Sequence, residues 1–214
     1  MDERQVVMMF AAMKAMRYDA IGVGVVDLRF LPTFLKASQE TGVQTVHIGP
    51  SDIPGTVPYI IKKVGATRVG IVSFGAVDPK DDGFELRKRR YATFRAVRAE
   101  SDVLILLDQA RVATDEWLQR NAERFGAPDI VIGGEATAYV TEPKIIGKTH
   151  VLPTSMEARF AGLAKVEIAA DKSLKIGYTR TSLDENFAED QDVKKMIEDY
   201  RRPAPAATAA APAG

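Results

Sequence analysis

The chain has 214 residues, 46% of them hydrophobic and 27% charged, which is typical of a globular protein with one α/β domain or at most two small ones. Its 29 basic and 29 acidic residues cancel, so no net charge attracts nucleic acid or an anionic membrane. The absence of cysteine excludes disulfides, thiolate catalysis and cysteine-ligated metals. No stretch reaches the roughly 20 apolar residues that cross a bilayer.

The first two thirds of the chain alternate between helical and strand patterns. The predicted elements, in order, are a helix over 3–16, a strand over 20–25, a helix over about 31–40 that Gly42 ends, a strand over 45–48, a β-hairpin of 59–64 and 68–74, a helix over about 86–100, a strand over 103–107, a helix over 113–125 and a strand over 129–132. The strands are apolar without a period-two alternation, which predicts a sheet covered on both faces.

After Gly134 the pattern becomes rich in strands. Segments 144–153 and 159–169 alternate, 174–180 pairs with the second of them as a hairpin, and a last helix covers about 191–201. We therefore predict an α/β fold in which mixed sheets form a sandwich flanked by helices. Residues 1–202 make up this domain. Residues 203–214 contain only Pro, Ala, Thr and Gly and are predicted to form a linker or tail.

Four strand-to-loop junctions are the candidate site. They read Gly24-Val25-Val26-Asp27, Leu107-Asp108-Gln109-Ala110, Gly133-Gly134-Glu135-Ala136-Thr137 and Ser155-Met156-Glu157-Ala158. The first three each follow a short apolar strand. Open α/β sheets bind their ligands at the carboxyl ends of strands, so these junctions have the position of an active site.

The segments around these junctions resemble the 5'-nucleotidase branch of the calcineurin-like metallophosphoesterases. Residues 18–27 read Tyr-Asp-Ala-Ile-Gly-Val-Gly-Val-Val-Asp and are similar to the family segment that ends in Gly-Asn-His. Residues 104–109 stand where the family has its Ser-His strand end, and 128–137 stand where it has Gly-Gly-His-Ser-His. The resemblance runs in the family's order over 8–201 and implies a metallophosphoesterase-like fold.

The resemblance also implies which residues would have held the metals. The family binds two divalent ions through Asp and His from two early strands, then through Asn, His and a His-x-His pair. Val25 stands at the Asn position, Val26 at the adjacent catalytic His, Gln109 at the next His, and Glu135 and Thr137 at the His-x-His pair. Valine has no lone pair for a metal and glutamine is a poor ligand. We therefore expect a degenerate site with no catalytic residue and no metal, a dry packed corner at the two valines, and a domain that lacks the family's first strands.

Two interpretations of the remaining carboxylates stay open. Asp27, Asp108 and Glu135 each follow a predicted strand, and if those strands are neighbours the three could bind one Mg²⁺ or Ca²⁺. Alternatively, Arg29 and Arg111 neutralise Asp27 and Asp108 in a polar cluster that caps the sheet.

Other polar groups have simpler interpretations. The two histidines, His47 and His150, lie in apolar strands and are expected to be structural, with a ligand or acid–base role as the alternative. Gly22-Val23-Gly24 is expected to be a tight strand exit rather than a phosphate loop. The basic run 87–90 lies on a helix whose buried stripe is Tyr91, Phe94 and Val97, which favours a solvated face over a nucleic-acid contact.

These observations predict a catalytically degenerate nucleotidase-like domain that acts as a structural or interaction module. Its alternative is a residual phosphoester hydrolase that uses a carboxylate-bound ion. Without the family's first strands a sheet edge is uncovered, so we expect self-association or a protein partner, and no nucleic acid. The sequence does not fix the compartment, and only the resemblance implies a periplasmic or extracellular one.

Overall fold

The computed structural model of the chain describes residues 2–24, 26–49, 52–75, 83–109, 115–121, 126–133, 142–154, 160–169, 171 and 173–202. Their helices and strands, in chain order, are α1 (Glu3–Ala15), β1 (Ala20–Gly22), the 3-10 helix η1 (Asp27–Phe30), α2 (Leu31–Thr41), β2 (Gln44–Val46), β3 (Tyr59–Val64), β4 (Thr67–Phe74), α3 (Phe84–Glu100), β5 (Val103–Asp108), α4 (Asp115–Asn121), β6 (Ile130–Gly133), β7 (Lys144–Ile146), β8 (Thr149–Leu152), β9 (Phe160–Ile168), β10 (Leu174–Ser182) and α5 (Gln191–Arg201). None of the helices in this described part of the chain has the length and apolar character that crossing a bilayer requires.

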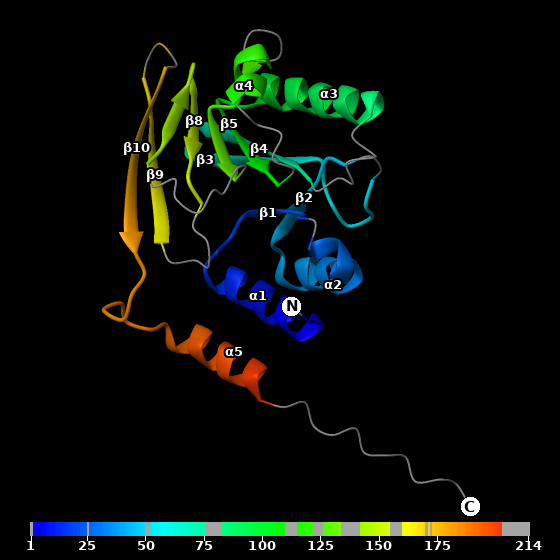
Figure 1. The fold of residues 1–214 in the computed structure, drawn as a ribbon, viewed down its shortest axis with the longest axis vertical. Coiled ribbons are helices and arrows are strands. Elements are labelled where there is room, and N and C mark those ends of the chain that lie inside the picture. The colour runs from blue at the N-terminus through cyan, green and yellow to red at the C-terminus, as the bar shows by residue number, and fades with distance from the viewer. Residues whose placement is uncertain are drawn as a thin grey trace, which may run out of the picture.

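Six strands form one mixed sheet in the order β3-β4-β5-β6-β8-β7. Strands β4, β5, β6 and β8 run parallel, while β3 and β7 pair antiparallel with their neighbours at the two edges. In Figure 1, α3 and α4 lie over one face of this sheet, and β1, β2, α1 and α2 lie over the other. The predicted α/β fold, with a mixed sheet flanked by helices, is confirmed.

The second layer of strands is small. β1 and β2 form a parallel two-stranded sheet, which a single bridge between Ile48 and Phe74 connects to the large sheet. The strand predicted over 20–25 ends at Gly22, because the amide of Gly24 donates to the carboxylate of Asp27 instead of to a neighbouring strand. The hairpin predicted over 59–64 and 68–74 is confirmed as the β3–β4 pair.

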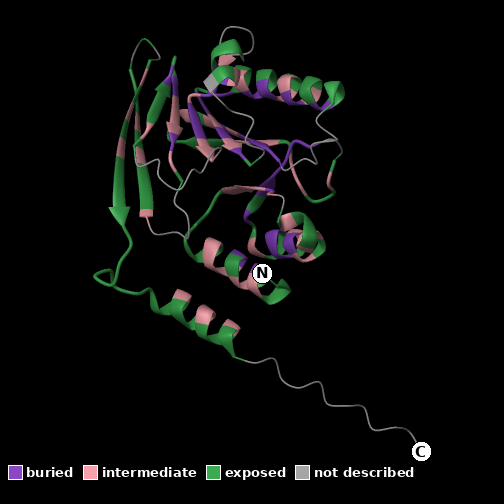
Figure 2. Ribbon diagram, viewed as in Figure 1, coloured by how far each residue is buried: buried purple, intermediate pink, exposed green. Residues whose placement is uncertain are grey.

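Two apolar clusters stabilise these layers, and Figure 2 shows them as buried segments of the ribbon. The larger cluster lies between the six-stranded sheet and the helices α3 and α4, and contains Phe74, Phe94, Leu106 and Leu118. The smaller one joins α1, α2 and β1 around the edge-to-face pair of Phe10 and Phe34. Burial of these side chains supplies most of the stability that the fold can draw on.

The last part of the chain forms an arm beside this body. β9 and β10 pair antiparallel over their whole length, and among the described residues neither strand joins another sheet. The arm ends in α5, which begins at the N-cap Asp190 and lies against α1 in Figure 1. No residue of β9, β10 or α5 is fully buried. Residues 203–214, the predicted tail, lie outside the described residues.

Candidate functional site

The carboxyl ends of the parallel strands form a row at one edge of the sheet. Phe74 at the end of β4 is paired with Asp108 at the end of β5, and Asp108 with Gly133 at the end of β6. A Cβ on Gly133, whose φ is 103°, would lie 2.9 Å from the carbonyl oxygen of Asp108. The glycine therefore allows the two strand ends to meet closely, in a backbone conformation that other residues rarely adopt. Glu135, Thr137 and the junction at 155–158 lie outside the described residues.

The exit of β1 joins this row from the other face of the sheet. Gly22 packs so closely that a Cβ there would overlap the hydroxyl of Ser73, and it would lie 2.9 Å from Cγ of Gln109. Gly24 lies next to the amide group of Gln109, since a Cβ added to Gly24 would be 3.7 Å from Oε1 of Gln109. The structure thus brings the first two predicted junctions together, and the glycines are tight strand exits as predicted.

Asp27 binds the backbone of its own loop. Its Oδ2 accepts a hydrogen bond from the N–H of Gly24 at 2.7 Å, which closes the turn between β1 and η1. Burial raises the pKa of the Asp27 carboxyl, and the bond from Gly24 opposes that shift. The structure describes both Asp27 and Arg29 and records no ion pair between them, so the predicted neutralisation by Arg29 is wrong. Arg111 lies outside the described residues.

The side chain of Asp108 lies on the face of the sheet opposite to β1 and Asp27. It is directly paired with Phe74, and paired residues of neighbouring strands direct their side chains to the same face. The ring centre of Phe74 lies 5.6 Å from that of Trp117 on α4 and 6.4 Å from that of Phe94 on α3. The buried Asp108 therefore faces the helices, whereas Asp27 lies beyond β1. In the described part of the chain no three His, Cys, Asp or Glu side chains form a group that could bind a metal ion.

Val26 does not make the dry, packed corner that we expected. The residue is 54% exposed, and it stands as the N-cap of η1, where its carbonyl oxygen accepts a hydrogen bond from the N–H of Arg29. The buried valine of this segment is Val23, which packs between α1 and α2. Val25 lies outside the described residues. The corner is therefore lined by an exposed apolar side chain and by the amide of Gln109, which is itself exposed.

His47 is buried at a second point of the same edge. Only 5% of the residue is exposed, and its imidazole lies against the backbone of Gly49 and Gly75, where a Cβ on either glycine would overlap the ring. Burial, and then the charges of Arg89 and Arg90, lower the pKa of His47, while Asp52 opposes them. Its Nδ1 has no hydrogen-bond partner among the described residues. His150 is half-buried within β8.

The basic run of α3 has one buried member. Arg90 donates to the carbonyl oxygen of Gly75 at 3.3 Å, and its guanidinium lies 5.0 Å from the centre of the Phe74 ring. Arg87 and Lys88 are exposed, and Arg89 forms an ion pair with Asp52. The run is therefore partly a structural anchor, which the helical spacing alone did not indicate.

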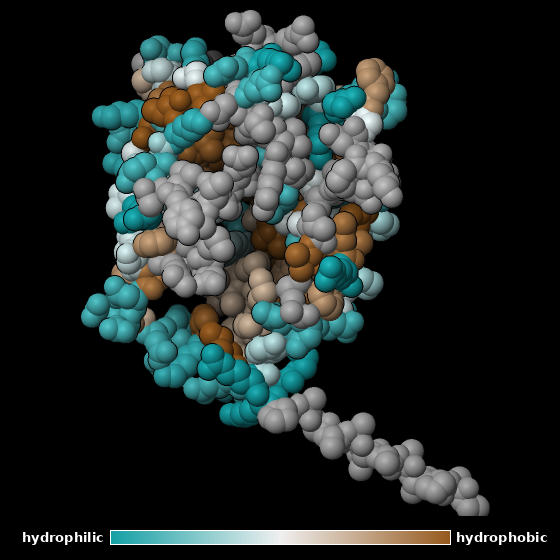
Figure 3. Space-filling model, viewed as in Figure 1, coloured by the Kyte–Doolittle hydropathy of each residue, from teal (hydrophilic) through white to brown (hydrophobic). Residues whose placement is uncertain are grey.

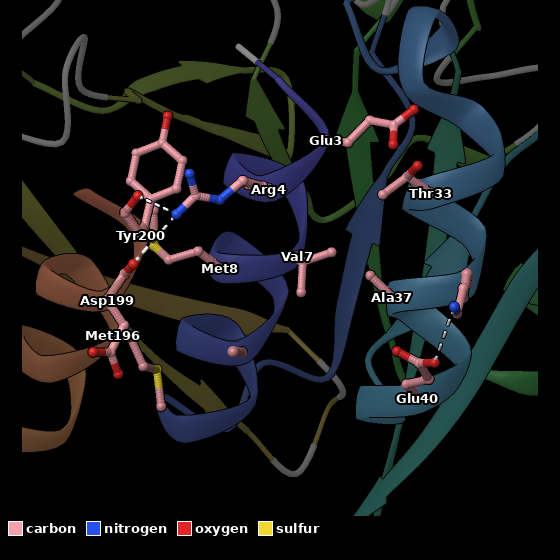
Figure 4. A pocket seen from close by; sticks show the side chains of 12 residues that line it. Glu3, Arg4, Val7, Met8, Thr33, Ala37, Glu40, Met196, Asp199 and Tyr200 are labelled. Atoms are coloured by element: carbon pink, nitrogen blue, oxygen red, sulfur yellow. Dashed lines mark hydrogen bonds and ion pairs between the residues drawn. The ribbon is translucent and has the colours of Figure 1, made fainter. Parts of the chain in front are cut away.

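An open cavity of about 680 Å³ lies far from the strand ends, across α1 and between α2 and α5. Figure 4 shows Val7 directed from α1 toward α2, Met8, Met196 and Tyr200 on the side of α5, and Glu40 on the side of α2. Lys36, which also lines the cavity, forms an ion pair with Glu40. Sequence reasoning did not identify it. The available signal was Val7, an apolar residue of α1 that is exposed.

Comparison with known proteins connects this architecture with one fold family. No protein-family model matches the sequence, and a search of curated proteins gives no match. Among solved structures, a 5'-nucleotidase precursor of Thermus thermophilus superposes with a TM-score of 0.68 at 16% identity, over 92% of this chain and 45% of that protein. NAD nucleotidase (NadN) of Haemophilus influenzae superposes at 0.64 with 11% identity, over 91% and 46% of the two chains. Sulfate thiohydrolase SoxB of Thermus thermophilus superposes at 0.64 with 15% identity, over 90% and 38%.

The chain thus has a 5'-nucleotidase-like fold of the metallophosphoesterase type, and it spans less than half the length of each of these proteins. At identities this low the likeness describes the fold alone.

Proposed function

We propose that this chain is a catalytically inactive nucleotidase-like domain that serves as a protein-interaction module. The observation that carries the proposal is the corner where β1 and β5 end. There the resemblance would place metal ligands or a catalytic histidine, and the chain has the exposed valine Val26 and the amide of Gln109. Neither side chain suits a divalent phosphoesterase ion.

The nearby carboxylates support the same proposal. Asp27 already accepts a hydrogen bond from Gly24, and Asp108 is buried on the face that α3 and α4 cover. A hard cation needs several oxygens that converge from one side. An ion held by Asp27, Asp108 and Glu135, the competing hydrolase hypothesis, would require Asp108 to turn away from its buried position.

Uncovered strands support the interaction role. β1 pairs only with β2, and β9 and β10 pair only with each other among the described residues. Strand edges of this kind present unpaired N–H and C=O groups that invite another strand. The resemblance supports a periplasmic or extracellular location, where the domain would act in a larger assembly.

Metal content and turnover test the proposal together. Purified protein is analysed for bound metals and assayed with an aryl phosphate ester in the presence of Mn²⁺, Mg²⁺ or Ca²⁺. We expect less than stoichiometric metal and no turnover above the buffer blank. Stoichiometric metal together with turnover that disappears in Glu135→Ala, but not in the control Glu142→Ala, would overturn the proposal in favour of the hydrolase.

A further inference from the structure

One backbone edge of β9 faces away from its partner strand. The N–H of Ala169 donates to the carbonyl oxygen of Ser173 at 2.9 Å, so residues 169 and 173 form a hydrogen-bonded pair of the ladder. Hydrogen-bonded and non-hydrogen-bonded pairs alternate along an antiparallel ladder. Lys165 and Glu167 therefore direct their backbone groups toward β10, in register with Gly177 and Lys175. The residues whose N–H and C=O groups point to the other edge, which no strand of the described residues covers, are Gly162, Ala164, Val166 and Ile168.

The two faces of the hairpin differ in character. The apolar face consists of Ala164, Val166, Ile168, Leu174, Ile176 and Tyr178, none of which is fully buried. Figure 3 shows apolar side chains gathered on the surface over β8 and the hairpin. The opposite face has Lys165 and Glu167, whose Nζ and Oε1 atoms lie 3.1 Å apart and whose side chains are 77% and 56% exposed.

The charges of Lys165 and Glu167 on one copy of β9 can pair with those of a second, antiparallel copy. A two-fold antiparallel pairing at the free edge can centre on any residue of β9, and the centre decides which side chains meet. When the centre is Val166, Lys165 lies opposite Glu167 of a second copy, and both such pairs are non-hydrogen-bonded pairs, in which the side chains come closest. A centre at Lys165 or Glu167 places that charge opposite its own copy. A centre at Ala164 places Lys165 opposite the apolar Leu163.

We propose that two copies of this chain associate by antiparallel pairing of β9 with β9 about a two-fold axis at Val166. The proposal specifies the partner of the interaction module proposed above and rests on it. The product is a four-stranded sheet in the order β10-β9-β9-β10, with the apolar face of the hairpin continuous across the axis. An isolated two-stranded hairpin is marginal in water, whereas additional strands make it stable, so the pairing also stabilises the arm. The interface is isologous and closes at the dimer.

Charge reversal and its rescue test this register. Sedimentation equilibrium of the full chain at low salt is expected to show a dimer for the wild type. Lys165→Glu and Glu167→Lys each place two like-charge pairs across the axis, and each is expected to weaken dimerisation roughly tenfold or more. An equimolar mixture of the two variants is expected to regain dimers, because the introduced glutamates then face the introduced lysines. Lys63→Glu, on the edge strand β3, is the matched control and leaves the dimer unchanged.

A backbone variant tests the edge itself. Ala164→Pro removes an N–H that points to the free edge and takes no part in the β9–β10 ladder. We expect a monomer that keeps the wild-type secondary structure by circular dichroism and has the stability of the undimerised chain. A wild-type monomer at several hundred micromolar, or a dimer that both single reversals leave intact, overturns the β9 pairing. The metal and turnover measurements are independent of this outcome, so an inert monomer would refute the dimer and leave the absence of hydrolase activity standing.

Discussion

The six-stranded sheet and the arm of β9, β10 and α5 differ in strand pairing and in side-chain burial. Strands β4, β5 and β6 each have a strand on both sides and an apolar cluster beneath the helices. The arm has no fully buried residue, and Arg4 of α1 binds carbonyl oxygens at the carboxyl end of α5. The difference teaches that stability resides in the sheet. The arm can therefore change its partners at little cost to the fold.

The largest expected effect comes from the centre of the sheet. Phe74 is 1% exposed and packs on Phe94 and Trp117, so Phe74→Ala leaves a large cavity. We expect the free energy of unfolding to fall by about 3–5 kcal/mol. Urea denaturation followed by far-ultraviolet circular dichroism measures the change.

The matched variant in the arm is Leu163→Ala, a side chain that is 69% exposed. Its effect should stay within about 0.5 kcal/mol, as for most surface substitutions. Equal losses of unfolding free energy in Phe74→Ala and Leu163→Ala would show that the arm contributes as much to stability as the sheet does. The difference between the two regions would then not exist.

Glycine substitutions compare the two regions at the level of the backbone. In Gly75→Ala the new methyl group would overlap the Nδ1 side of the His47 ring, and the backbone of Gly49 lies close to its Nε2 side. We expect a loss of about 1–3 kcal/mol, the usual cost of overpacking. In Gly177→Ala, on β10, the methyl group meets no atom within 4 Å. That variant should be neutral or more stable by about 0.5 kcal/mol, and a comparable loss at both sites would contradict the prediction.

Acidification should weaken the body through His47. The folded state lowers the pKa of this imidazole, whereas in the unfolded chain it titrates near its ordinary value of about 6.5. The unfolded state therefore binds the proton first as the pH falls. The free energy of unfolding should decrease below about pH 6.5, by at most about 1.4 kcal/mol per pH unit, until the folded imidazole also protonates.

Urea midpoints between pH 5 and pH 8 measure this slope, with His47→Gln as the test and His150→Gln as the control. The slope should become shallower only in the first variant. A slope that persists unchanged in His47→Gln would assign the acid sensitivity to other groups.

The sequence was sufficient for the elements whose local pattern and tertiary role agree. Gly42 ends α2 with a φ of 78°, and the apolar strands of the large sheet lie where their pattern placed them. It failed where individual side-chain contacts decide the outcome. The exposure of Val26 follows from the turn that Asp27 and Gly24 close, and the orientation of Asp108 follows from its register with Phe74. The first contact spans only three residues, but the local sequence left open whether Asp27 binds the backbone or an arginine. The second joins strands that are far apart in the sequence and has no local signature. The cavity across α1 was missed for the same reason, since it exists only when α2 and α5 are both in place.

The smallest expected effect concerns the attachment of the arm. Arg4 donates to the carbonyl oxygens of Tyr200 at 2.7 Å and Arg202 at 2.8 Å, and its guanidinium lies 5.6 Å from the centre of the Tyr200 ring. These contacts satisfy carbonyl groups that the end of a helix leaves unpaired. In Arg4→Ala we expect the amides of α5 to exchange about tenfold faster with solvent deuterium, while the global free energy of unfolding changes by less than about 0.5 kcal/mol. Lys14→Ala, near the other end of α1, is the control and should change neither quantity. A global loss of more than about 1 kcal/mol in Arg4→Ala would mean that α5 unfolds together with the sheet, and the arm would then have to be counted as part of the body.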